Sequence, residues 1–226
     1  MAVIGIMDSG SGGLSVLREI RKVLPNQRYI YYADNAWCPY GEKTPDFIIE
    51  RLHYITDLFL ERGAVAVVLA CNTATSAAIA DLRAYYSIPF VGMEPAIKPA
   101  ALGSRTGVVG VLATRGTFNG RLYRQTSSRV PGSVKIIEAV ADEFVTLVER
   151  GETAGPAVET VVRARLEPLI AAGADRIVLG CTHFPHLKPV MEKIVAGRAE
   201  IVDPSDAVAR RVRDVLQAAR RAKHED

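Results

Sequence analysis

Short runs rich in valine and isoleucine alternate along the chain with longer segments whose apolar side chains recur every three to four residues. Runs of the first kind are typical of buried strands, and segments of the second kind are typical of amphipathic helices. The pattern predicts strands at 3–7, 29–33, 65–70, 90–93, 106–113, 134–139, 176–180 and 200–202. It predicts helices between them, among others at 14–24, 46–61 and 74–85. Strands that alternate with helices favour a parallel sheet, so the expected fold class is α/β.

Two nine-residue segments are similar enough to indicate an internal duplication. Gly63–Cys71 and Gly173–Cys181 align without a gap and are identical at five of their nine positions. A duplicated chain predicts two pseudo-symmetric lobes, each a mainly parallel sheet flanked by helices, with the active site in the cleft between them. We expect the first lobe to span 1–98 together with a returning C-terminal helix at 205–226, and the second lobe to span 99–204.

Bulk composition narrows the class of protein. The 226 residues are 49% hydrophobic and 23% charged, as in an ordinary globular protein, and the net charge is +3. No apolar run approaches the roughly 20 residues needed to span a bilayer, and the first residues lack the pattern of a signal peptide. Three cysteines, an odd number, fit a reducing compartment, so a cytoplasmic protein without a membrane partner is expected. We interpret a basic group near the C-terminus as a solvated helix face rather than a nucleic-acid site: Arg210, Arg211, Arg213, Arg220, Arg221 and Lys223.

Polar side chains follow several of the predicted strands at the point where each strand ends. In open parallel α/β sheets, ligands bind beyond the carboxyl ends of the strands. We therefore expect one site to be lined by the residues at these ends, which are Asp8, Ser9, Asp34, Cys71, Asn72, Thr73, Glu94, Thr114, Cys181, Thr182 and His183.

The first of these ends opens a glycine-rich turn at 8–13. The turn fails both the dinucleotide fingerprint and the P-loop pattern, so phosphate binding is not expected. Its glycines and the helix that follows can still direct backbone N–H groups at a carboxylate. The alternative is a tight turn without a ligand.

The recurring cysteines, Cys71 and Cys181, are the main candidates for chemistry. A lone free cysteine is usually a small buried hydrophobic residue. Here a cysteine recurs where a strand enters a predicted helix, and a helix N-terminus stabilises a thiolate. Two opposed thiols suggest a reaction that needs two opposed proton carriers. A zinc site made from these cysteines and His183 is not favoured, because the chain lacks a compact set of metal ligands.

A thiol is a poor base toward a carbon acid unless neighbouring groups assist it. Asp8 and Asp34 are the candidates to assist Cys71. His183, supported by a carboxylate such as Glu149, is the candidate to assist Cys181. Structural alternatives stay open: the two aspartates can be helix N-caps, and Glu149 can be an ordinary exposed residue of an amphipathic helix.

Several motifs, in order over nearly the whole chain, resemble those of the glutamate racemases in the aspartate/glutamate racemase superfamily. They lie at 8–16, 34, 39–41, 70–74, 94–95, 113–117, 147–149, 179–183 and 203. The resemblance implies a two-base racemase that needs no cofactor and no metal, with Cys71 and Cys181 as the bases. It implies that Asp8 and Asp34 assist the first base and that His183 and Glu149 assist the second. The positions that match substrate-holding residues are Ser9, Pro39, Tyr40, Gly41, Asn72, Thr73, Thr114, Thr117 and Thr182.

One departure from the family pattern bears on the substrate. Between Asp34 and Pro39 the chain carries Asn-Ala-Trp-Cys, where the usual glutamate racemases have Thr-Ala-Arg and an apolar residue. An indole at Trp37 thus replaces a cation. We interpret Cys38 as structural, because the other half of the chain has no counterpart.

The predicted reaction is racemisation of free L-glutamate to D-glutamate for cell-wall peptidoglycan synthesis. The alternatives are an aspartate or broad acidic amino-acid racemase and, from another class, a protein that binds an acidic amino acid without turnover. The expected partner is thus a small acidic amino acid and not a nucleic acid. The sequence leaves the oligomeric state open, a homodimer included.

Overall fold

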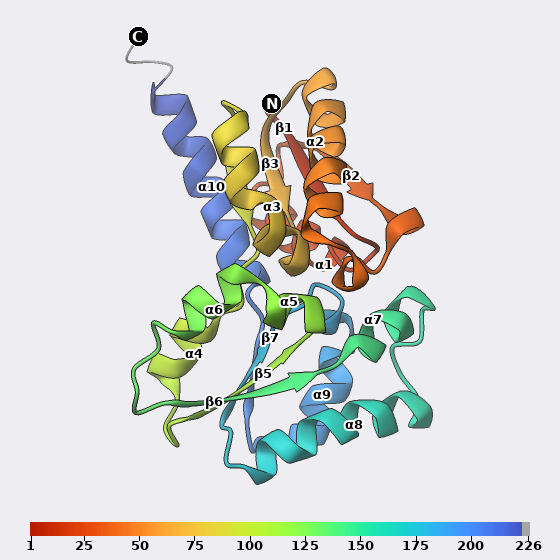
Figure 1. Ribbon diagram of the computed structural model, residues 1–226, viewed down its shortest axis with the longest axis vertical. Coiled ribbons are helices and arrows are strands. Elements are labelled where there is room, and N and C mark those ends of the chain that lie inside the picture. The colour runs from red at the N-terminus through yellow and green to blue at the C-terminus, as the bar shows by residue number, and fades with distance from the viewer. Residues whose placement is uncertain (223–226) are drawn as a thin grey trace. The chain divides into compact units, whose positions relative to one another are not determined.

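The structure is a computed structural model that describes residues 1–222, and it contains two parallel four-stranded sheets flanked by helices (Figure 1). The chain divides into two compact units, Met1–Met93 with the segment from Ser205 onward, and Glu94–Pro204. The second unit begins earlier than the predicted residue 99, because helix α4 (Ile97–Gly103) packs against strands of the second sheet. The predicted α/β class with two lobes is confirmed.

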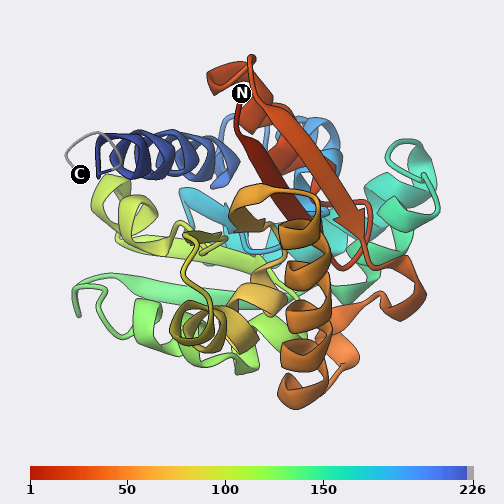
Figure 2. The same ribbon diagram turned by 90° about the horizontal axis from the view of Figure 1, so that it is seen from above.

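In the first unit the strand order is β2-β1-β3-β4. The strands are β1 (Val3–Asp8), β2 (Arg28–Ala33), β3 (Ala64–Leu69) and β4 (Phe90–Gly92). Around them lie α1 (Leu14–Val23), α2 (Pro45–Glu61), α3 (Asn72–Tyr85), α10 (Ser205–Ala222) and the 3-10 turns η1 (Asn35–Trp37) and η2 (Tyr40–Glu42). Helices α1 and α10 pack on one face of the sheet, and α2 and α3 pack on the other (Figure 2).

Alternation along β3 explains why this sheet is covered on both faces. Ala66 and Val68 join the cluster under α1 and α10, whereas Val67 and Leu69 join the cluster under α2 and α3. Both sets are buried, so the strand appears in the sequence as a continuous apolar run, as is usual for parallel sheets. The start of α2 follows the ordinary rules, because the Thr44 hydroxyl accepts a hydrogen bond from the Phe47 N–H and a proline opens the helix.

The second unit repeats this arrangement with strand order β6-β5-β7-β8. The strands are β5 (Val108–Ala113), β6 (Lys135–Val140), β7 (Arg176–Leu179) and β8 (Glu200–Val202). The further helices are α5 (Arg115–Asn119), α6 (Arg121–Ser127), α7 (Asp142–Glu149), α8 (Pro156–Ala171), η3 (Phe184–Leu187) and α9 (Lys188–Val195). Counted within each unit, both sheets have the order 2-1-3-4, which is the topology that the predicted duplication requires.

A glycine in the first strand of each unit shows how closely the duplication is kept. A Cβ added at Gly5 in β1 would lie 2.5 Å from Cδ2 of Phe59 on α2. A Cβ added at Gly110 in β5 would lie 2.9 Å from Cδ1 of Leu169 on α8. In both units the missing side chain makes room for an apolar residue from the covering helix.

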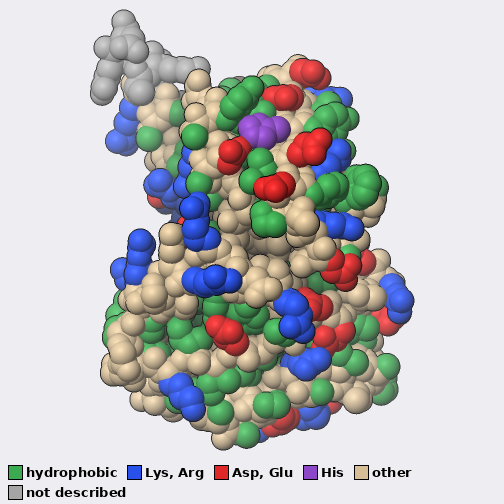
Figure 3. Space-filling view, in the orientation of Figure 1, with side chains coloured by type: hydrophobic (Ala, Val, Ile, Leu, Met, Phe, Trp, Pro, Cys, Tyr) green, Lys and Arg blue, Asp and Glu red, His purple; other side chains and the backbone are tan. Residues whose placement is uncertain are grey.

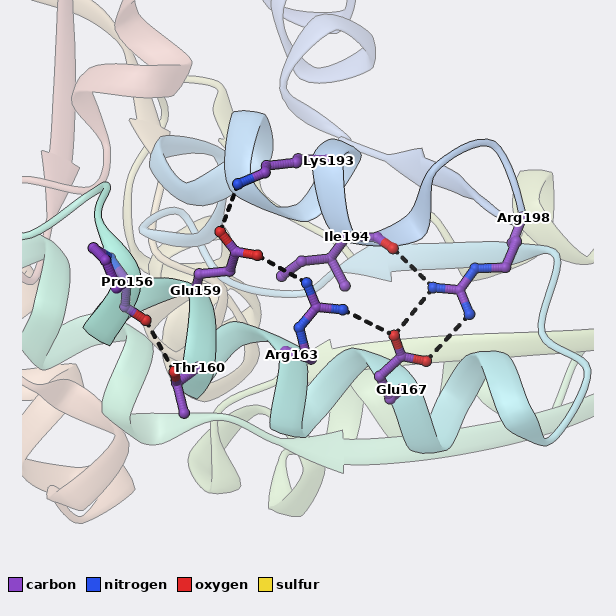
Figure 4. Close-up of polar contacts among 8 residues, drawn as sticks. All are labelled: Pro156, Glu159, Thr160, Arg163, Glu167, Lys193, Ile194 and Arg198. Carbon is purple, nitrogen blue, oxygen red and sulfur yellow. Dashed lines mark hydrogen bonds and ion pairs between the residues drawn. The ribbon is translucent and has the colours of Figure 1, made fainter.

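An exposed ion-pair network joins α8 to α9 and the residues after it in the second unit (Figure 4). Glu159 accepts hydrogen bonds from Lys193 at 2.7 Å and from Arg163 at 2.8 Å, and Glu167 accepts from Arg163 and from Arg198. The hydrogen bond from Lys193 is the largest cause that lowers the pKa of Glu159, and the one from Arg198 is the largest that lowers the pKa of Glu167. Because the network is solvated, its effect on stability is small.

The C-terminal helix α10 has a buried face and a charged face. Val208, Val212 and Leu216 pack into the first unit, while Arg210 and Arg211 are exposed, as the solvated-face interpretation expects. Lys223 and the side chain of Arg220 lie outside the described residues.

Lys, Arg, Asp and Glu side chains are interspersed on the face shown in Figure 3. Among the described helices, none combines the length and the apolar character that a membrane crossing requires.

Candidate active site

In the first unit, three predicted site residues start from the same edge of the sheet. Asp8 ends β1, Asp34 follows β2, and Cys71 lies two residues beyond β3. The strand order places β1 between β2 and β3, and the Asp34 N–H donates to the Asp8 carbonyl at 3.0 Å. Their exposed fractions are 0%, 3% and 6%, so all three side chains are buried.

Cys71 is the N-cap of α3, a 14-residue helix. Its Sγ accepts a hydrogen bond from the backbone N–H of Ala74 at 3.4 Å. A sulfur in this position takes the role that a serine or aspartate oxygen usually has, and the positive end of the helix dipole favours its thiolate form. The predicted strand-to-helix placement is confirmed for this cysteine.

The side chain of Asn72, the first residue of α3, is buried without a hydrogen-bond partner among the described residues. It is 4% exposed, and neither Oδ1 nor Nδ2 is paired. An unpaired buried donor or acceptor costs about 1–3 kcal/mol. Buried polar groups in native proteins are nearly always paired, so an amide left in this state points to a ligand that supplies the missing bonds.

Neither aspartate caps a helix through its side chain. Asp34 precedes η1, but its side chain makes no capping hydrogen bond there. Its carboxylate instead accepts from the Tyr40 hydroxyl at 2.6 Å and from Arg51 Nη2 at 2.7 Å and Nε at 3.1 Å. Asp8 closes its own turn, since Oδ2 accepts from the Gly10 N–H at 3.0 Å. Asp34 thus holds the N-cap position of η1 without a capping side chain, and the N-cap of α1 is Gly13 rather than Asp8.

Arg51 is a site residue that the sequence analysis missed. It lies on α2, which the hydrophobic pattern predicts correctly as a helix, but an arginine on an amphipathic helix is ordinary. Its partner Asp34 is 17 positions away in the sequence. Only the packing of α2 on the sheet brings the two together, so no local sequence signal was available.

In the second unit, His183 links Cys181 to Glu149. Its Nδ1 lies 3.7 Å from the Cys181 Sγ, and its Nε2 lies 2.5 Å from Glu149 Oε1. His183 is 1% exposed, whereas Glu149, the last residue of α7, is partly exposed. A carboxylate on one ring nitrogen fixes the ring and directs the other nitrogen at the sulfur. The pairing of His183 with Glu149 that the sequence analysis expected is present.

The group next to the Cys181 thiol differs from the one next to the Cys71 thiol. The prediction that it precedes a helix N-terminus in the same way is wrong, because a turn and the 3-10 segment η3 follow it and α9 begins only at Lys188. The Phe184 N–H donates to the Cys181 carbonyl at 3.2 Å, and the His186 N–H donates to that of His183. Pro185 lies at the start of η3 and lacks an N–H group. A helix dipole thus supports one thiol, and an imidazole supports the other.

Buried threonines surround the strand ends near Cys181. Thr114, which follows β5, caps α5 by accepting from the Thr117 N–H at 3.3 Å, and the two hydroxyls lie 3.1 Å apart. The Thr117 hydroxyl also donates to the Gly180 carbonyl at 3.5 Å. Thr182 is 2% exposed. The hydroxyls expected at this site thus gather within one unit.

The other residues predicted in the first unit lie just after β1, in the first turn of α3 and in the loop after β2. Ser9 and Thr73 are buried, Tyr40 is 1% exposed, and Pro39 and Gly41 are partly exposed. Glu94, also expected at a strand end, is exposed and lies at the start of the second unit.

The indole that departs from the family pattern lies on this loop. Trp37 is 43% exposed and contacts Phe47 edge to face at 5.1 Å between ring centroids. The Nζ of Lys43 lies 5.9 Å from the Trp37 ring. Trp37 therefore packs against its own loop and the start of α2.

Comparison with known proteins agrees with the fold. The family model described as Asp/Glu/Hydantoin racemase matches residues 4–212. Glutamate racemase from Pseudomonas putida strain F1 is 49% identical over 218 residues, which is 96% of this chain and 82% of the relative. Glutamate racemase from Pseudomonas entomophila is 47% identical over 216 residues, which is 95% of this chain and 82% of the relative.

Solved structures are similar over the same length. Escherichia coli glutamate racemase in complex with L-glutamate and the activator UDP-MurNAc-Ala matches with a TM-score of 0.89 and 37% identity, over 96% of this chain and 82% of the other. Francisella tularensis glutamate racemase in complex with D-glutamate matches with a TM-score of 0.82 and 27% identity, over 97% and 82%.

The fold, the recurring thiols and these similarities together define an amino-acid racemase, which is an isomerase. The family model covers most of the chain, and relatives at nearly half identity cover almost all of it. The chain belongs to the Asp/Glu/hydantoin racemase family.

Proposed function

We propose that the protein interconverts L-glutamate and D-glutamate with Cys71 and Cys181 as its two bases. The observation that carries the proposal is the equivalent position of the thiols: each lies two residues beyond the third strand of its unit, in sheets of the same strand order. Both thiols have a supporting group, which a merely structural cysteine does not need. The names of the relatives support glutamate as the substrate.

The proposed reaction balances with protons alone. One thiolate takes the Cα proton, and the thiol of the other cysteine delivers a proton to the opposite face of the same carbon, so the centre is inverted. The electron pair left at Cα spreads into the α-carboxylate and returns when the new C–H bond forms. Hydrogen-bond donors around that carboxylate stabilise its developing charge. The two cysteines exchange roles in the reverse direction, and the proposal needs no cofactor.

Each unit supplies groups for this reaction. In the first unit, the Asn72 amide is the unpaired donor and acceptor that a bound amino acid would satisfy. Ser9, Thr73 and residues 39–41 are the other proposed substrate-binding residues of this unit. In the second unit, Thr114, Thr117 and Thr182 take the same role. Asp8 and Asp34 assist Cys71, and His183 with Glu149 assists Cys181.

The proposed setting is the cytoplasm, where D-glutamate would enter cell-wall precursors, and a homodimer is the proposed assembly.

The proposed function predicts that the purified protein racemises free glutamate. Circular dichroism of L-glutamate incubated with the protein should decay to zero, and the signal of D-glutamate should decay to the same end point. L-Aspartate under the same conditions should lose its signal at least about tenfold more slowly, the scale of discrimination that one methylene gives. A faster decay with aspartate would replace the proposal with an aspartate racemase. Measurable binding of glutamate with a constant signal would replace it with a binding protein.

A substitution of Asn72 tests whether its buried side-chain amide binds the substrate. The Asn72→Ala variant should raise the KM for glutamate about tenfold or more, because hydrogen bonds to a charged ligand contribute about 1.5–3 kcal/mol. Its thermal stability without ligand should stay equal or rise, because an unpaired buried amide is removed. Asn26→Ala, at an exposed asparagine of the same unit, is the matched control. An unchanged KM together with lower stability would assign Asn72 to the fold rather than to the substrate.

A further inference from the structure

Both oxygens of the Asp34 carboxylate accept hydrogen bonds from protein groups. Oδ1 accepts from Arg51 Nη2 at 2.7 Å, and Oδ2 accepts from Arg51 Nε at 3.1 Å and from the Tyr40 hydroxyl at 2.6 Å. The Arg51 contact is a two-point ion pair, the geometry in which guanidinium binds a carboxylate most specifically. Because Asp34 is 3% exposed, water does not screen this pair as it screens a surface ion pair.

Arg51 is held in this position from its own helix. Its neighbours Ile48, Leu52 and Ile55 are buried and anchor α2 against the sheet. The guanidinium carbon lies 4.9 Å from the centre of the Tyr54 ring, within the range of a cation–π interaction. The hydrogen bond to Asp34 is the largest cause that raises the pKa of Arg51 above its ordinary value, so the side chain stays a cation.

Tyr40 links the Asp34–Arg51 ion pair to the first thiol, because it is hydrogen-bonded to Asp34 and packs in the same cluster as Cys71. Tyr40 and Cys71 belong to the same buried cluster, and η2 packs against α3. Burial is the largest cause that raises the pKa of Tyr40, followed by the hydrogen bond to Asp34 and the negative charges of Asp34 and Cys71. The hydroxyl therefore remains a neutral donor to Asp34, and it lies within the electrostatic range of a Cys71 thiolate.

We propose that Arg51 is a positioning residue of the first base: it cancels the charge of Asp34 and holds that carboxylate and the Tyr40 hydroxyl beside Cys71. The inference rests on the proposed function in that it takes Cys71 as a base of the racemase. It also changes the role expected of Asp34. A carboxylate tied to a guanidinium and to a tyrosine acts on the thiol through its place in a neutral pair, not as a free proton acceptor.

The charge balance around Asp34 gives the inference its physical content. Asp34 is hydrogen-bonded to Tyr40 on η2 and to Arg51 on α2, and its backbone N–H donates to Asp8 on β1. Arg51 is in turn hydrogen-bonded to Tyr32 on β2 and lies over the Tyr54 ring on α2. Arg51 is the cation in this group. Without it, the carboxylates of Asp34 and Asp8 would leave an uncompensated negative field that disfavours a thiolate at Cys71.

The test compares pH profiles of racemisation in both directions for the wild-type protein and for Arg51→Met. In the direction that uses Cys71 as the base, the acid limb of kcat should move up by about one pH unit, the scale of one nearby buried charge. In the opposite direction Cys71 is the acid, so the alkaline limb should move up instead. A merely structural role for Arg51 would lower kcat at every pH and move neither limb, which would overturn the inference.

Two further variants keep the test decisive if Arg51→Met folds poorly. Arg51→Met with Asp34→Asn removes both charges of the pair and should return the limbs to their wild-type positions. Arg51→Lys keeps the charge and loses the two-point geometry, so it should lower kcat with unmoved limbs. Arg62→Met, at an exposed arginine that ends the same helix, is the matched control. Limbs that stay shifted in the double variant would contradict the inference.

A direct titration separates this inference from the proposed function. In a Cys38→Ser and Cys181→Ser background, thiolate absorbance near 240 nm, corrected with the variant that also lacks Cys71, reports Cys71 alone. Arg51→Met should move this titration to higher pH. If the wild-type protein racemises glutamate and the titration does not move, the role of Arg51 alone is overturned. If the titration moves but the wild-type protein has no racemase activity, the proposed function is overturned and the charge pair stays as inferred.

Discussion

The Cys71→Ser and Cys181→Ser variants are each expected to lose racemase activity by about 10²–10⁴-fold, the range that a general acid or base contributes. Serine is nearly isosteric with cysteine, so the fold should be kept. A serine hydroxyl, however, is far weaker as an acid than a thiol and supplies almost no anion near neutral pH. Initial rates measured by circular dichroism from L-glutamate and from D-glutamate test both halves of the reaction.

The third cysteine supplies the matched control. Cys38 follows η1, is half-buried and has no equivalent in the second unit, so the nearly isosteric change Cys38→Ser should retain activity within about twofold. If Cys38→Ser loses activity while Cys71→Ser keeps it, the loop cysteine takes over the role of the first base and the assignment from the duplication is wrong.

The second large effect is expected at His183. His183→Asn should lower kcat by about 10²-fold or more, because the side chain that lies 3.7 Å from the Cys181 sulfur can no longer exchange or balance its proton. Glu149→Gln should cost about tenfold, since it removes the charge that orients the ring but keeps a hydrogen-bonding group. The double variant should be no slower than His183→Asn alone, because Glu149 acts through the histidine.

Glu143→Gln is the matched control for this series, because Glu143 lies on the same helix α7 but pairs with Arg165 on the surface. Its kcat should equal that of the wild-type protein. Steady-state kinetics in both directions provides the measurement. If the losses from Glu149→Gln and His183→Asn simply multiply in the double variant, Glu149 acts independently of the imidazole and the proposed chain from carboxylate to sulfur is wrong.

The two thiols are equivalent in topology but not in environment. The helix dipole at Cys71 is a fixed property of the backbone, whereas the imidazole beside Cys181 is itself titratable. Variants of the first unit should therefore change charge balance around an otherwise fixed site. Variants of His183 and Glu149 should change the path by which a proton reaches the sulfur. This difference explains why a duplicated fold does not predict duplicated helpers.

The hydrophobic pattern was sufficient to predict all eight strands, each within about two residues of its observed bounds. Buried parallel strands are continuous runs of valine, isoleucine and alanine, and the segment Ala64–Leu69 is a clear case. The carboxyl ends of the strands then placed Asp8, Asp34 and Cys71 at one edge without further information. The start of α3 differs by a similar amount: the helix begins at Asn72, two residues before the predicted start, because Cys71 itself caps it.

Other features depended on packing that a sequence does not display. Arg51 meets Asp34 only because α2 lies on the sheet, and the unpaired state of the Asn72 amide exists only once the surrounding residues are folded. The regular helix expected directly after Cys181 is replaced by a turn and a 3-10 segment, in keeping with the turn that Pro185 favours between His183 and His186. Strand and helix types follow from periodicity, whereas ion pairs between distant segments follow from tertiary structure.

The most direct test of the two-thiol claim follows hydrogen at Cα. L-Glutamate is incubated with the protein in D₂O, the reaction is stopped at low conversion, and each enantiomer is separated and analysed by mass. With two bases on opposite faces, the D-glutamate formed should carry deuterium at Cα in every molecule, while the remaining L-glutamate stays unlabelled. Product that keeps the original proton, or equal deuterium in both enantiomers, would show that a single base serves both faces and would contradict the account.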